Sequence, residues 1–298
     1  MKYVFFGTPE FAARVLEKLI ASGLAPAVVV CNPDRPVGRK QVLTAPPIKS
    51  LFLKPEARNL DGAVPVLQPE KLDDGFRFQV SGFRPDLFVI ASYGKILPAD
   101  VLAIPRLGTV VVHPSLLPKY RGATPIQSAL LAGDATTGVS LLLADEKVDH
   151  GPVLAKREAH IVKRETYETL VQKLANLAGE LLVETLPKYV AGEITLQSQD
   201  ESQATFTKKF TTEDSYVLEA DLKTALDGSN PEAARAIDRK IRALNPEPGV
   251  WSQINGLAIG HTQITGNKRV KLLDAEVVDG ALKLTVIQIE GKNPQKLV

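Results

Sequence analysis

The sequence predicts an α/β fold, with a doubly wound, largely parallel β-sheet in the first part of the chain and a smaller, β-rich domain after it. The first part alternates short runs of β-branched and aromatic residues with stretches whose apolar residues recur at helical spacing. Near-continuous apolar strands that alternate with helices are typical of a sheet covered on both faces. The end of the chain instead carries short alternating strands separated by Gly and Asn turns. A chain of 298 residues suits one large and one smaller domain.

The first predicted strand, KYVFF (2–6), is followed by a helix over PEFAARVLEKLIASG (9–23). In that helix Phe11, Val15 and Leu19 share one face, with a proline at the start and a glycine at the end. Four further buried strands are expected at APAVVVC (25–31), DLFVIAS (86–92), GTVVVH (108–113) and TGVSLLLA (137–144), and a further helix at TPIQSALLAGD (124–134). Ligands bind beyond the carboxyl ends of the strands in such a sheet, so the loops that follow these strands are the candidate site.

A long helix, RETYETLVQKLANLAGELLVETLPKYVAG (164–192), closes the first domain, and the polar stretch after it has the composition of a linker. Beyond it we expect a helix over PEAARAIDRKIRAL (231–244) and strands at RVKLLDAEVV (269–278) and ALKLTVIQIEG (281–291). The predicted organisation is a large α/β domain over residues 1–192, a linker over 193–207 and a β-rich, barrel-like domain over 208–298.

Composition excludes several classes of protein. The hydrophobic share of 44% and the charged share of 23% are ordinary for a globular protein. No apolar run approaches the roughly 18 residues of a membrane span, and the first apolar stretch is too short for a signal peptide, so we expect a cytoplasmic protein with no membrane partner. Cys31 is the only cysteine and the four histidines lack metal-site spacing, which argues against a disulfide and against a metal site. The first strand-to-helix turn has no GxGxxG, which disfavours a dinucleotide site.

His113 ends the predicted strand GTVVVH and is followed at once by Pro114. A doubly wound sheet presents ligand-contacting side chains at this place, although a hydrogen-bonded structural histidine fits the position equally well. The proline-bounded loop SLLPKYRG (115–122) comes next. Its two leucines either form a satellite of the core or pack against a flat aromatic ligand.

The loop ADEKVDHGP (144–152) follows another buried strand and gathers three acidic residues and His150. A surface-exposed acidic turn is the simpler interpretation of this loop taken alone. Asp149 gains a functional interpretation if it approaches His113, because a carboxylate can hold an imidazole in its charged, donating form. Sequence spacing does not establish that contact.

Two groups of cations suggest a polyanionic partner. They are Arg35, Arg39 and Lys40 in the loop NPDRPVGRKQ (32–41), and Arg239, Lys240 and Arg242 in the helix at 231–244. Solvated surface charge explains either group. Three cations in a loop at the ligand edge of the sheet also suit a phosphate backbone. The net charge of +2 is too small to decide between these alternatives.

Together these features resemble the methionyl-tRNA formyltransferase family over nearly the whole chain. The matching segments are FFGTPEFA, PDRPVGRK, APPIK, ASYGKILP, HPSLLPKYRGATPIQSALLAGD, TGVSLLLADEKVDHGPVL and IRALNPEPGVW. The central segments are shared with the wider group of folate-dependent formyltransferases, whereas the basic loop and the last segment narrow the resemblance to the tRNA enzymes.

The resemblance implies a Rossmann-like domain that uses 10-formyltetrahydrofolate as co-substrate and formylates the methionine on initiator tRNA in translation initiation, as a monomer and without a metal. The implied folate contacts are Tyr93, Gly94, Ile96, Ser115, Leu116, Leu117 and Pro118, and the implied tRNA contacts are the two groups of cations. The implied catalytic residues are His113 and Asp149. A cationic His113 would donate to the oxyanion that forms when the amine attacks, while Asp149 would keep His113 charged and help to relay the amine proton.

One departure from the family bears on catalysis. The family carries asparagine two residues before the histidine, where this sequence has Val111. Residues two apart on a strand face the same side, so the asparagine amide would donate a second hydrogen bond to the oxyanion, which valine cannot do. Milder departures are Lys147, where the family usually has glycine, and His150, where it usually has threonine. We therefore expect an enzyme that is impaired in the chemical step.

Two other functions stay open at this point. A formyltransferase for a sugar amine would share the folate segments, but it would not need the basic loop or the segment IRALNPEPGVW. A folate- or tRNA-binding protein that has lost catalysis is suggested by Val111 alone, and the presence of both His113 and Asp149 argues against it.

Overall fold

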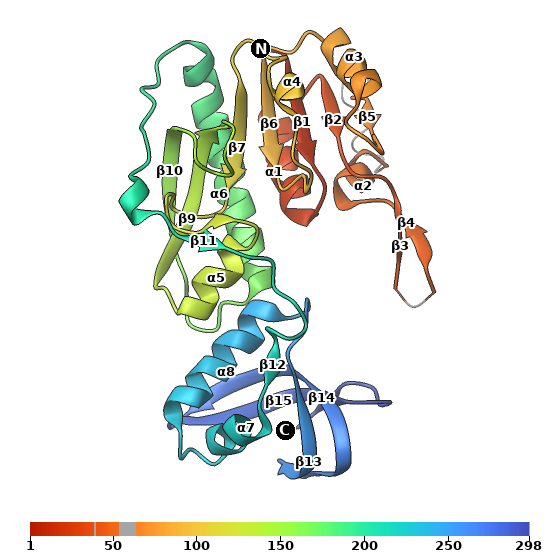
Figure 1. Ribbon diagram of the computed structural model, residues 1–298, viewed down its shortest axis with the longest axis vertical. Coiled ribbons are helices and arrows are strands. Elements are labelled where there is room, and N and C mark those ends of the chain that lie inside the picture. Colours follow the sequence, from red (N-terminus) through yellow and green to blue (C-terminus); the bar gives the residue numbers. More distant parts are fainter. Residues whose placement is uncertain (39, 54–63, 298) are drawn as a thin grey trace. The chain divides into compact units, whose positions relative to one another are not determined.

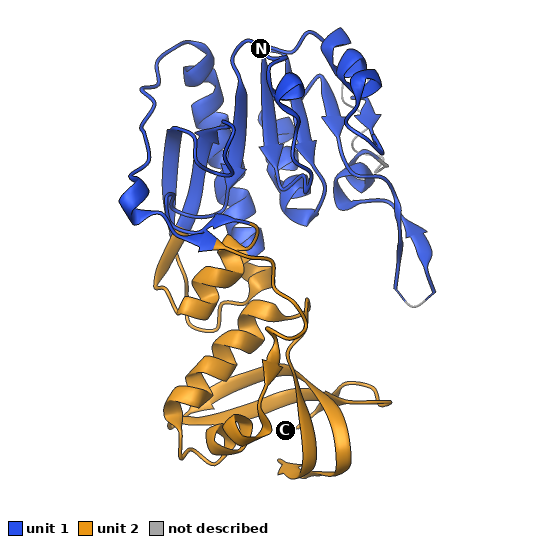
Figure 2. Ribbon diagram, viewed as in Figure 1, with its two compact units in different colours: residues 1–122, 138–159, 171–206 blue, residues 123–137, 160–170, 207–298 orange. Residues whose placement is uncertain are grey.

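The computed structural model describes residues 1–38, 40–53 and 64–297, and the chain forms two compact units (Figure 2). The first unit comprises residues 1–122, 138–159 and 171–206, and the second comprises residues 123–137, 160–170 and 207–298. Each unit is therefore assembled from separate segments of the sequence. The predicted domain boundaries at residues 192 and 207 stay a prediction.

A seven-stranded sheet with the order β10-β9-β7-β6-β1-β2-β5 forms the centre of the first unit. Its strands are β1 (Tyr3–Gly7), β2 (Val28–Val30), β5 (Val66–Leu67), β6 (Leu87–Ala91), β7 (Thr109–His113), β9 (Thr136–Leu143) and β10 (Val153–His160). Neighbours from β5 to β7 pair in parallel, whereas β9 pairs antiparallel with β7. The chain winds outward from β1 in both directions, so the predicted doubly wound, largely parallel sheet is confirmed.

Helices pack beside this sheet (Figure 1). They are α1 (Glu10–Ala21), α2 (Pro47–Leu53), α3 (Asp74–Gly82), α4 (Ala99–Leu102) and α6 (Tyr167–Val190). In α1 the side chains of Phe11, Val15 and Leu19 are buried, as their spacing predicts, and Glu10 and Lys18 complement the helix dipole at the two ends. Among the helices of the described ranges, none has both the length and the apolar character that crossing a membrane requires.

The core of the first unit uses alternate residues of its strands, because successive side chains of a strand point to opposite faces. One cluster of buried residues comprises Val4, Phe6, Val28, Val30, Phe76, Val80, Phe88, Tyr93, Leu97 and Val101. The ring of Phe6 is at its centre and meets Phe88 and Tyr93 edge to face, with centroids 5.0 and 5.4 Å away.

Short strands extend from this unit. An antiparallel hairpin of β3 (Arg35–Val37) and β4 (Val42–Thr44) follows β2, and its Val37, Val42 and Leu43 are exposed. Two further strands, β8 (Arg121–Gly122) and β11 (Phe206–Thr207), pair with each other, and the 3-10 helix η2 (Glu201–Gln203) precedes β11. The pairing of β8 with β11 brings residues near 200 to the loop that follows His113.

The second unit is built on a five-stranded sheet with the order β12-β13-β14-β15-β16. Its strands are β12 (Tyr216–Val217), β13 (Trp251–Ile259), β14 (Thr262–Val278), β15 (Ala281–Ile289) and β16 (Gln295–Lys296), and its helices are α5 (Pro125–Ala132), α7 (Glu219–Leu226) and α8 (Pro231–Leu244). β13, β14 and β15 pair antiparallel with irregular registers, and Figure 1 shows these long strands curving. The predicted β-rich second domain is confirmed.

Candidate active site

A pocket of about 620 Å³ opens at the first unit, over the strands that end near His113. Its floor is a row of apolar residues, because Ile90 of β6 stands opposite Val111 of β7, which stands opposite Leu142 of β9. The residues that line it are Ile90, Lys95, Ile96, Leu97, Ala99, Leu102, Ala103, Val111, Leu142 and residues 144–149. The volume and the apolar floor with a few charged groups are those of a small-molecule site.

His113 ends β7 two residues beyond Val111 and is 4% exposed. Its Nδ1 lies 3.5 Å from Oδ2 of Asp149, and its Nε2 lies 2.9 Å from the main-chain oxygen of Tyr120. A carbonyl and a carboxylate both only accept, so the imidazolium is the form of His113 that can donate to both neighbours. The approach of Asp149 to His113, on which its functional interpretation depends, is present.

Asp149 is held in place by its own loop and by the segment after His113. Its Oδ2 accepts a hydrogen bond of 2.8 Å from the main-chain nitrogen of Gly122. Its φ is +52°, in the left-handed region that few non-glycine residues adopt. The loop then returns so close to β9 that a Cβ on Gly151 would lie 1.9 Å from the carbonyl oxygen of Leu143. Glycine is therefore required at position 151 for this loop path.

Lys147 and His150, two of the three residues that depart from the family pattern, are tied into this loop. His150 Nδ1 lies 2.6 Å from Oδ2 of Asp145, and the main-chain nitrogen of Lys147 donates to Oδ1 of Asp145 at 2.9 Å. Burial raises the pKa of Asp145, but the hydrogen bonds from His150 and Lys147 outweigh it, so the pKa lies below its ordinary value. The other nitrogen of His150 lies 3.6 Å from Oε1 of Glu201. The loop is therefore linked to η2 as well.

The residues that resemblance implies for folate binding lie in different surroundings. Ile96 lines the pocket and is 86% exposed. Tyr93 belongs to the core around Phe6, where burial raises its pKa to about 12. Gly94 follows it with a φ of +83°. The structure thus brings Ile96, but not the Tyr93 ring, to the pocket.

Hydrogen bonds to Lys119 and Ser140 hold the segment Ser115–Pro118 in place. Ser115 Oγ donates to the main-chain oxygen of Lys119 at 2.6 Å, and Ser140 Oγ donates to that of Ser115 at 2.7 Å. Ser115 is buried, and Leu116 and Pro118 are half-buried. These residues shape the loop, and their contact with folate stays a prediction.

Leu117 supports the pocket floor from within the protein. It forms a buried cluster with Leu142 and Val153, against which Val111 packs. Because Val111 and Leu142 also line the pocket, Leu117 acts on the pocket through them.

The two predicted groups of tRNA-binding cations differ in their surroundings. Arg35 and Lys40 are exposed at the β3–β4 hairpin, while Arg39 lies outside the described residues. On α8, Lys240 Nζ donates to the main-chain oxygen of Tyr216 at 3.0 Å, and burial lowers the pKa of its ammonium group. The guanidinium of Arg239 lies against Gly133.

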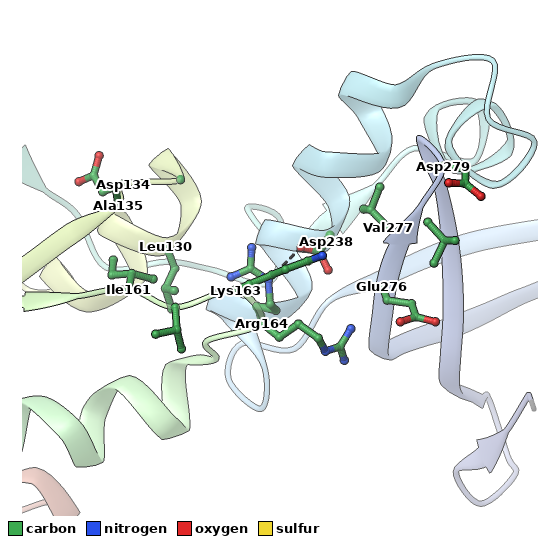
Figure 3. A pocket seen from close by; sticks show the side chains of 14 residues that line it. Leu130, Asp134, Ala135, Ile161, Lys163, Arg164, Asp238, Glu276, Val277 and Asp279 are labelled. Carbon is green, nitrogen blue, oxygen red and sulfur yellow. Dashed lines mark hydrogen bonds and ion pairs between the residues drawn. The ribbon is translucent and has the colours of Figure 1, made fainter.

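A second pocket, also of about 620 Å³, lies within the second unit and is drawn in Figure 3. It is lined by Leu130, residues 133–135, residues 161–164, Asp238, Arg242 and residues 276–279. Arg242 pairs with Asp238 at 2.9 Å and donates to the main-chain oxygen of Glu165 at 2.9 Å. This lining contains neither histidine nor cysteine, and nowhere in the described ranges do three or more His, Cys, Asp or Glu side chains form a group that could hold a metal ion.

Two residues beside Asp149, Arg121 and Gln199, are not apparent from the sequence as part of the site. Arg121 is 2% exposed and donates to the side chain of Gln199, which in turn donates to the main chain of Asp149. Arg121 and Gln199 are 78 positions apart, so no local spacing links them. In the sequence, the one indication of this arrangement is a basic residue, Arg121, in the loop after His113.

Comparison with known proteins shows the family of the chain over nearly its whole length. The formyl transferase family matches residues 1–186, and the formyl transferase C-terminal domain matches residues 231–292. The methionyl-tRNA formyltransferase of Roseiflexus sp. (strain RS-1) is 38% identical over an alignment of 309 positions, which covers 99% of this chain and 90% of that protein. The solved methionyl-tRNA formyltransferase from Clostridium thermocellum is 15% identical, with a TM-score of 0.58 over 97% of this chain and 98% of that one. HypX from Aquifex aeolicus in complex with tetrahydrofolic acid is 17% identical, with a TM-score of 0.63 over 100% of this chain and 46% of that one. At these identities the two solved structures show the fold alone.

Proposed function

Because this chain belongs to the formyl transferase family, and within it to the methionyl-tRNA formyltransferases, we propose that it formylates the methionine carried by initiator tRNA, with 10-formyltetrahydrofolate as the donor. The observation that carries this proposal is the contact between His113 and Asp149 beside the pocket of the first unit. The folate lies over the floor of Ile90, Val111 and Leu142, and the tRNA contacts the cations of the hairpin and of α8. The protein acts in translation initiation, as a cytoplasmic monomer.

In the first step, the amino nitrogen of methionine forms a bond to the formyl carbon, and the carbonyl electron pair moves to oxygen. His113 in its charged form donates a hydrogen bond to the resulting oxyanion, which is the state whose charge the site must stabilise. In the structure the Nε2 hydrogen of His113 faces the carbonyl of Tyr120 at 2.9 Å. That hydrogen bond is exchanged for one to the oxyanion when the substrates are bound.

In the second step, the oxyanion re-forms the carbonyl and the bond from the formyl carbon to the folate nitrogen breaks. The amine loses one proton and the folate nitrogen gains one, so the products are formylmethionyl-tRNA and tetrahydrofolate. Asp149, whose side chain is 13% exposed, faces His113 and helps to relay this proton. The cationic imidazole supplies the positive charge at the oxyanion, and we propose no metal in the reaction.

A single-turnover assay with the formyl donor and charged initiator tRNA tests the proposal. Formylation of the methionine is expected, at a low rate because Val111 supplies no hydrogen-bond donor. A parallel reaction with an amino sugar distinguishes the sugar-amine alternative, which would be favoured if the sugar alone were formylated. Binding of folate and tRNA without any transfer would identify a protein that has lost catalysis.

A further inference from the structure

The main chain at Asp149 is held by a side chain that is distant in the sequence. Gln199 Nε2 donates to the main-chain oxygens of Asp149 at 2.9 Å and of Gly151 at 2.8 Å. Asp149 has a φ of +52°. This conformation is uncommon for a non-glycine residue, although Asp adopts it more readily than most, so contacts that hold the main chain there stabilise it. Gln199 therefore holds the main chain at Asp149 itself and again at Gly151, two residues further on, and this stabilises the conformation that aims Asp149 at His113.

Arg121 determines which way the amide of Gln199 points. Gln199 Oε1 accepts hydrogen bonds from Arg121 Nε at 3.1 Å and from Nη2 at 2.9 Å. A guanidinium can only donate and a carbonyl can only accept. The amide oxygen therefore faces Arg121 and the amide nitrogen faces the loop, because the reverse orientation would lose all four hydrogen bonds.

Arg121 is itself fixed in position. It is 2% exposed, and its Nη1 and Nη2 form two hydrogen bonds to Glu201 at 2.9 and 2.6 Å, a geometrically specific arrangement. The next residue, Gly122, donates its main-chain N–H to Asp149 Oδ2 at 2.8 Å. Residues 121–122 thus hold Asp149 twice, directly at the carboxylate and through Gln199 at the main chain.

We propose that Gln199 is a positioning residue, which keeps the Asp149 carboxylate at His113 by holding the main chain of the loop. Its effect on the reaction rate rests on the proposed function, whereas its hold on the loop does not. Gln199 touches no reacting atom, and the apolar floor of Ile90, Val111 and Leu142 lies on strands that it does not hold. Its loss should therefore lower turnover much more than folate affinity, although the loop that it holds lines one side of the pocket.

The test uses Gln199→Glu, which keeps the length of the side chain and the pairing with Arg121 but cannot donate to the two carbonyls. The single-turnover rate should fall about tenfold while the folate dissociation constant stays within about twofold. Hydrogen exchange of the Gly122 amide should accelerate by about tenfold, because its acceptor on Asp149 is no longer fixed. Gln203→Glu is the matched control, since it introduces the same charge at an exposed residue of η2 and should change neither quantity.

A double-mutant cycle separates positioning from general stability. In an Asp149→Ala background, Gln199→Glu should alter the rate less than about twofold, because Gln199 acts through Asp149. Equal losses in both backgrounds, or Gly122 exchange that matches the Gln203→Glu control, would overturn the proposal. If the unsubstituted chain transfers no formyl group, the proposed function fails and Gly122 exchange alone decides whether Gln199 holds the loop. Should Gln199→Glu fail to fold, Gln199→Met serves the same test, since it has similar length and no donor.

Discussion

Val111 is the residue whose replacement should raise the rate. It lines the pocket and packs against the cluster of Leu117, Leu142 and Val153. Val111→Asn keeps nearly the same bulk and adds an amide donor on the face that carries His113. One oxyanion donor is worth about 10²- to 10³-fold in turnover, so the single-turnover rate should rise by up to that factor. Folate affinity should change little, because the charge on the oxyanion exists only in the transition state.

Two further variants separate a donor effect from a packing effect at this position. Val111→Leu adds bulk without a donor, so it should not raise the rate. In the Val111→Asn background, His113→Ala should remove most of the gain, since both side chains act on the same oxygen. An unchanged rate in Val111→Asn, with His113 still in contact with Asp149, would mean that a water or another donor takes the place assigned to residue 111.

Cys31 should be inert to thiol reagents in the folded protein. Burial raises the pKa of its thiol from 9.0 to about 11, so at pH 8 only about one molecule in a thousand carries the reactive thiolate. A thiol reagent at pH 8 should therefore modify the chain only after denaturation, with a stoichiometry of one; rapid labelling of the native protein would contradict the burial. The same difference in pKa makes stability depend on pH. In the unfolded chain the thiol ionises near 9.0, so the contribution of the buried, neutral thiol to the free energy of unfolding is complete below pH 9.0 and is lost as the pH rises toward about 11.

At the level of single residues, the sequence was sufficient for His113 but not for its surroundings. The position of His113 at a strand end follows from the run of β-branched residues before it. Its contact with Asp149 depends on left-handed conformations at Tyr120 and Asp149, with φ of +62° and +52°, which local propensity disfavours. The hydrogen bonds of Gln199 depend on long-range pairing of β8 with β11. No short-range pattern encodes either feature.

The hairpin of β3 and β4 is the element that we expect to control the salt dependence of tRNA binding. Arg35 and Lys40 are exposed on it, and each phosphate contact contributes about 0.7 to 0.9 to the slope of log affinity against log salt. Arg35→Ala and Lys40→Ala should each flatten that slope by this amount, and together by about twice as much. Filter binding across a salt series measures the slopes.

Lys2→Ala is the control for the hairpin variants, because Lys2 is an exposed cation at the start of β1, whereas the hairpin follows the end of β2. It should leave the slope unchanged. The hairpin side chains are exposed, so the thermal midpoint of unfolding should stay the same in all these variants. Slopes equal to that of the unsubstituted chain would show that the hairpin carries only solvated charge.

Elements with strong apolar periodicity could be predicted, and those set by distant contacts could not. α1, α6 and α8 lie where the spacing of apolar residues predicts helices. The sequence predicts a loop where β3 and β4 form a hairpin, because its prolines and glycine are typical of loops. The folate contact of Tyr93 stays a prediction, and its ring lies in the aromatic cluster around Phe6. The other rings of that cluster, Phe76 and Phe88, come from α3 and β6, so no local pattern reveals this packing.

At the scale of the whole molecule, the residues predicted to bind folate and those predicted to bind tRNA are distributed differently between the two units. Every residue that lines the candidate folate pocket belongs to the first unit, within residues 90–149. The predicted tRNA contacts occur in both units, on the hairpin and on α8. Folate affinity should therefore be independent of the cations of both elements, whereas tRNA affinity should depend on both.

Calorimetry with a stable 10-formyl-folate analogue, and tRNA binding across a salt series, test this division in Lys40→Ala and Arg239→Ala. Arg239 suits the test better than Lys240 or Arg242, which are held by hydrogen bonds to Tyr216 and Asp238 and would disturb the second unit if removed. Each variant should lower the tRNA salt slope by about 0.7 to 0.9 and leave the folate dissociation constant unchanged within about twofold. If only Lys40→Ala changes the slope, the predicted tRNA contact of Arg239 is wrong, and Arg239 serves to pack against Gly133. If the unsubstituted chain binds no folate analogue even at millimolar concentration, the pocket is not a folate site and the proposed reaction has no donor.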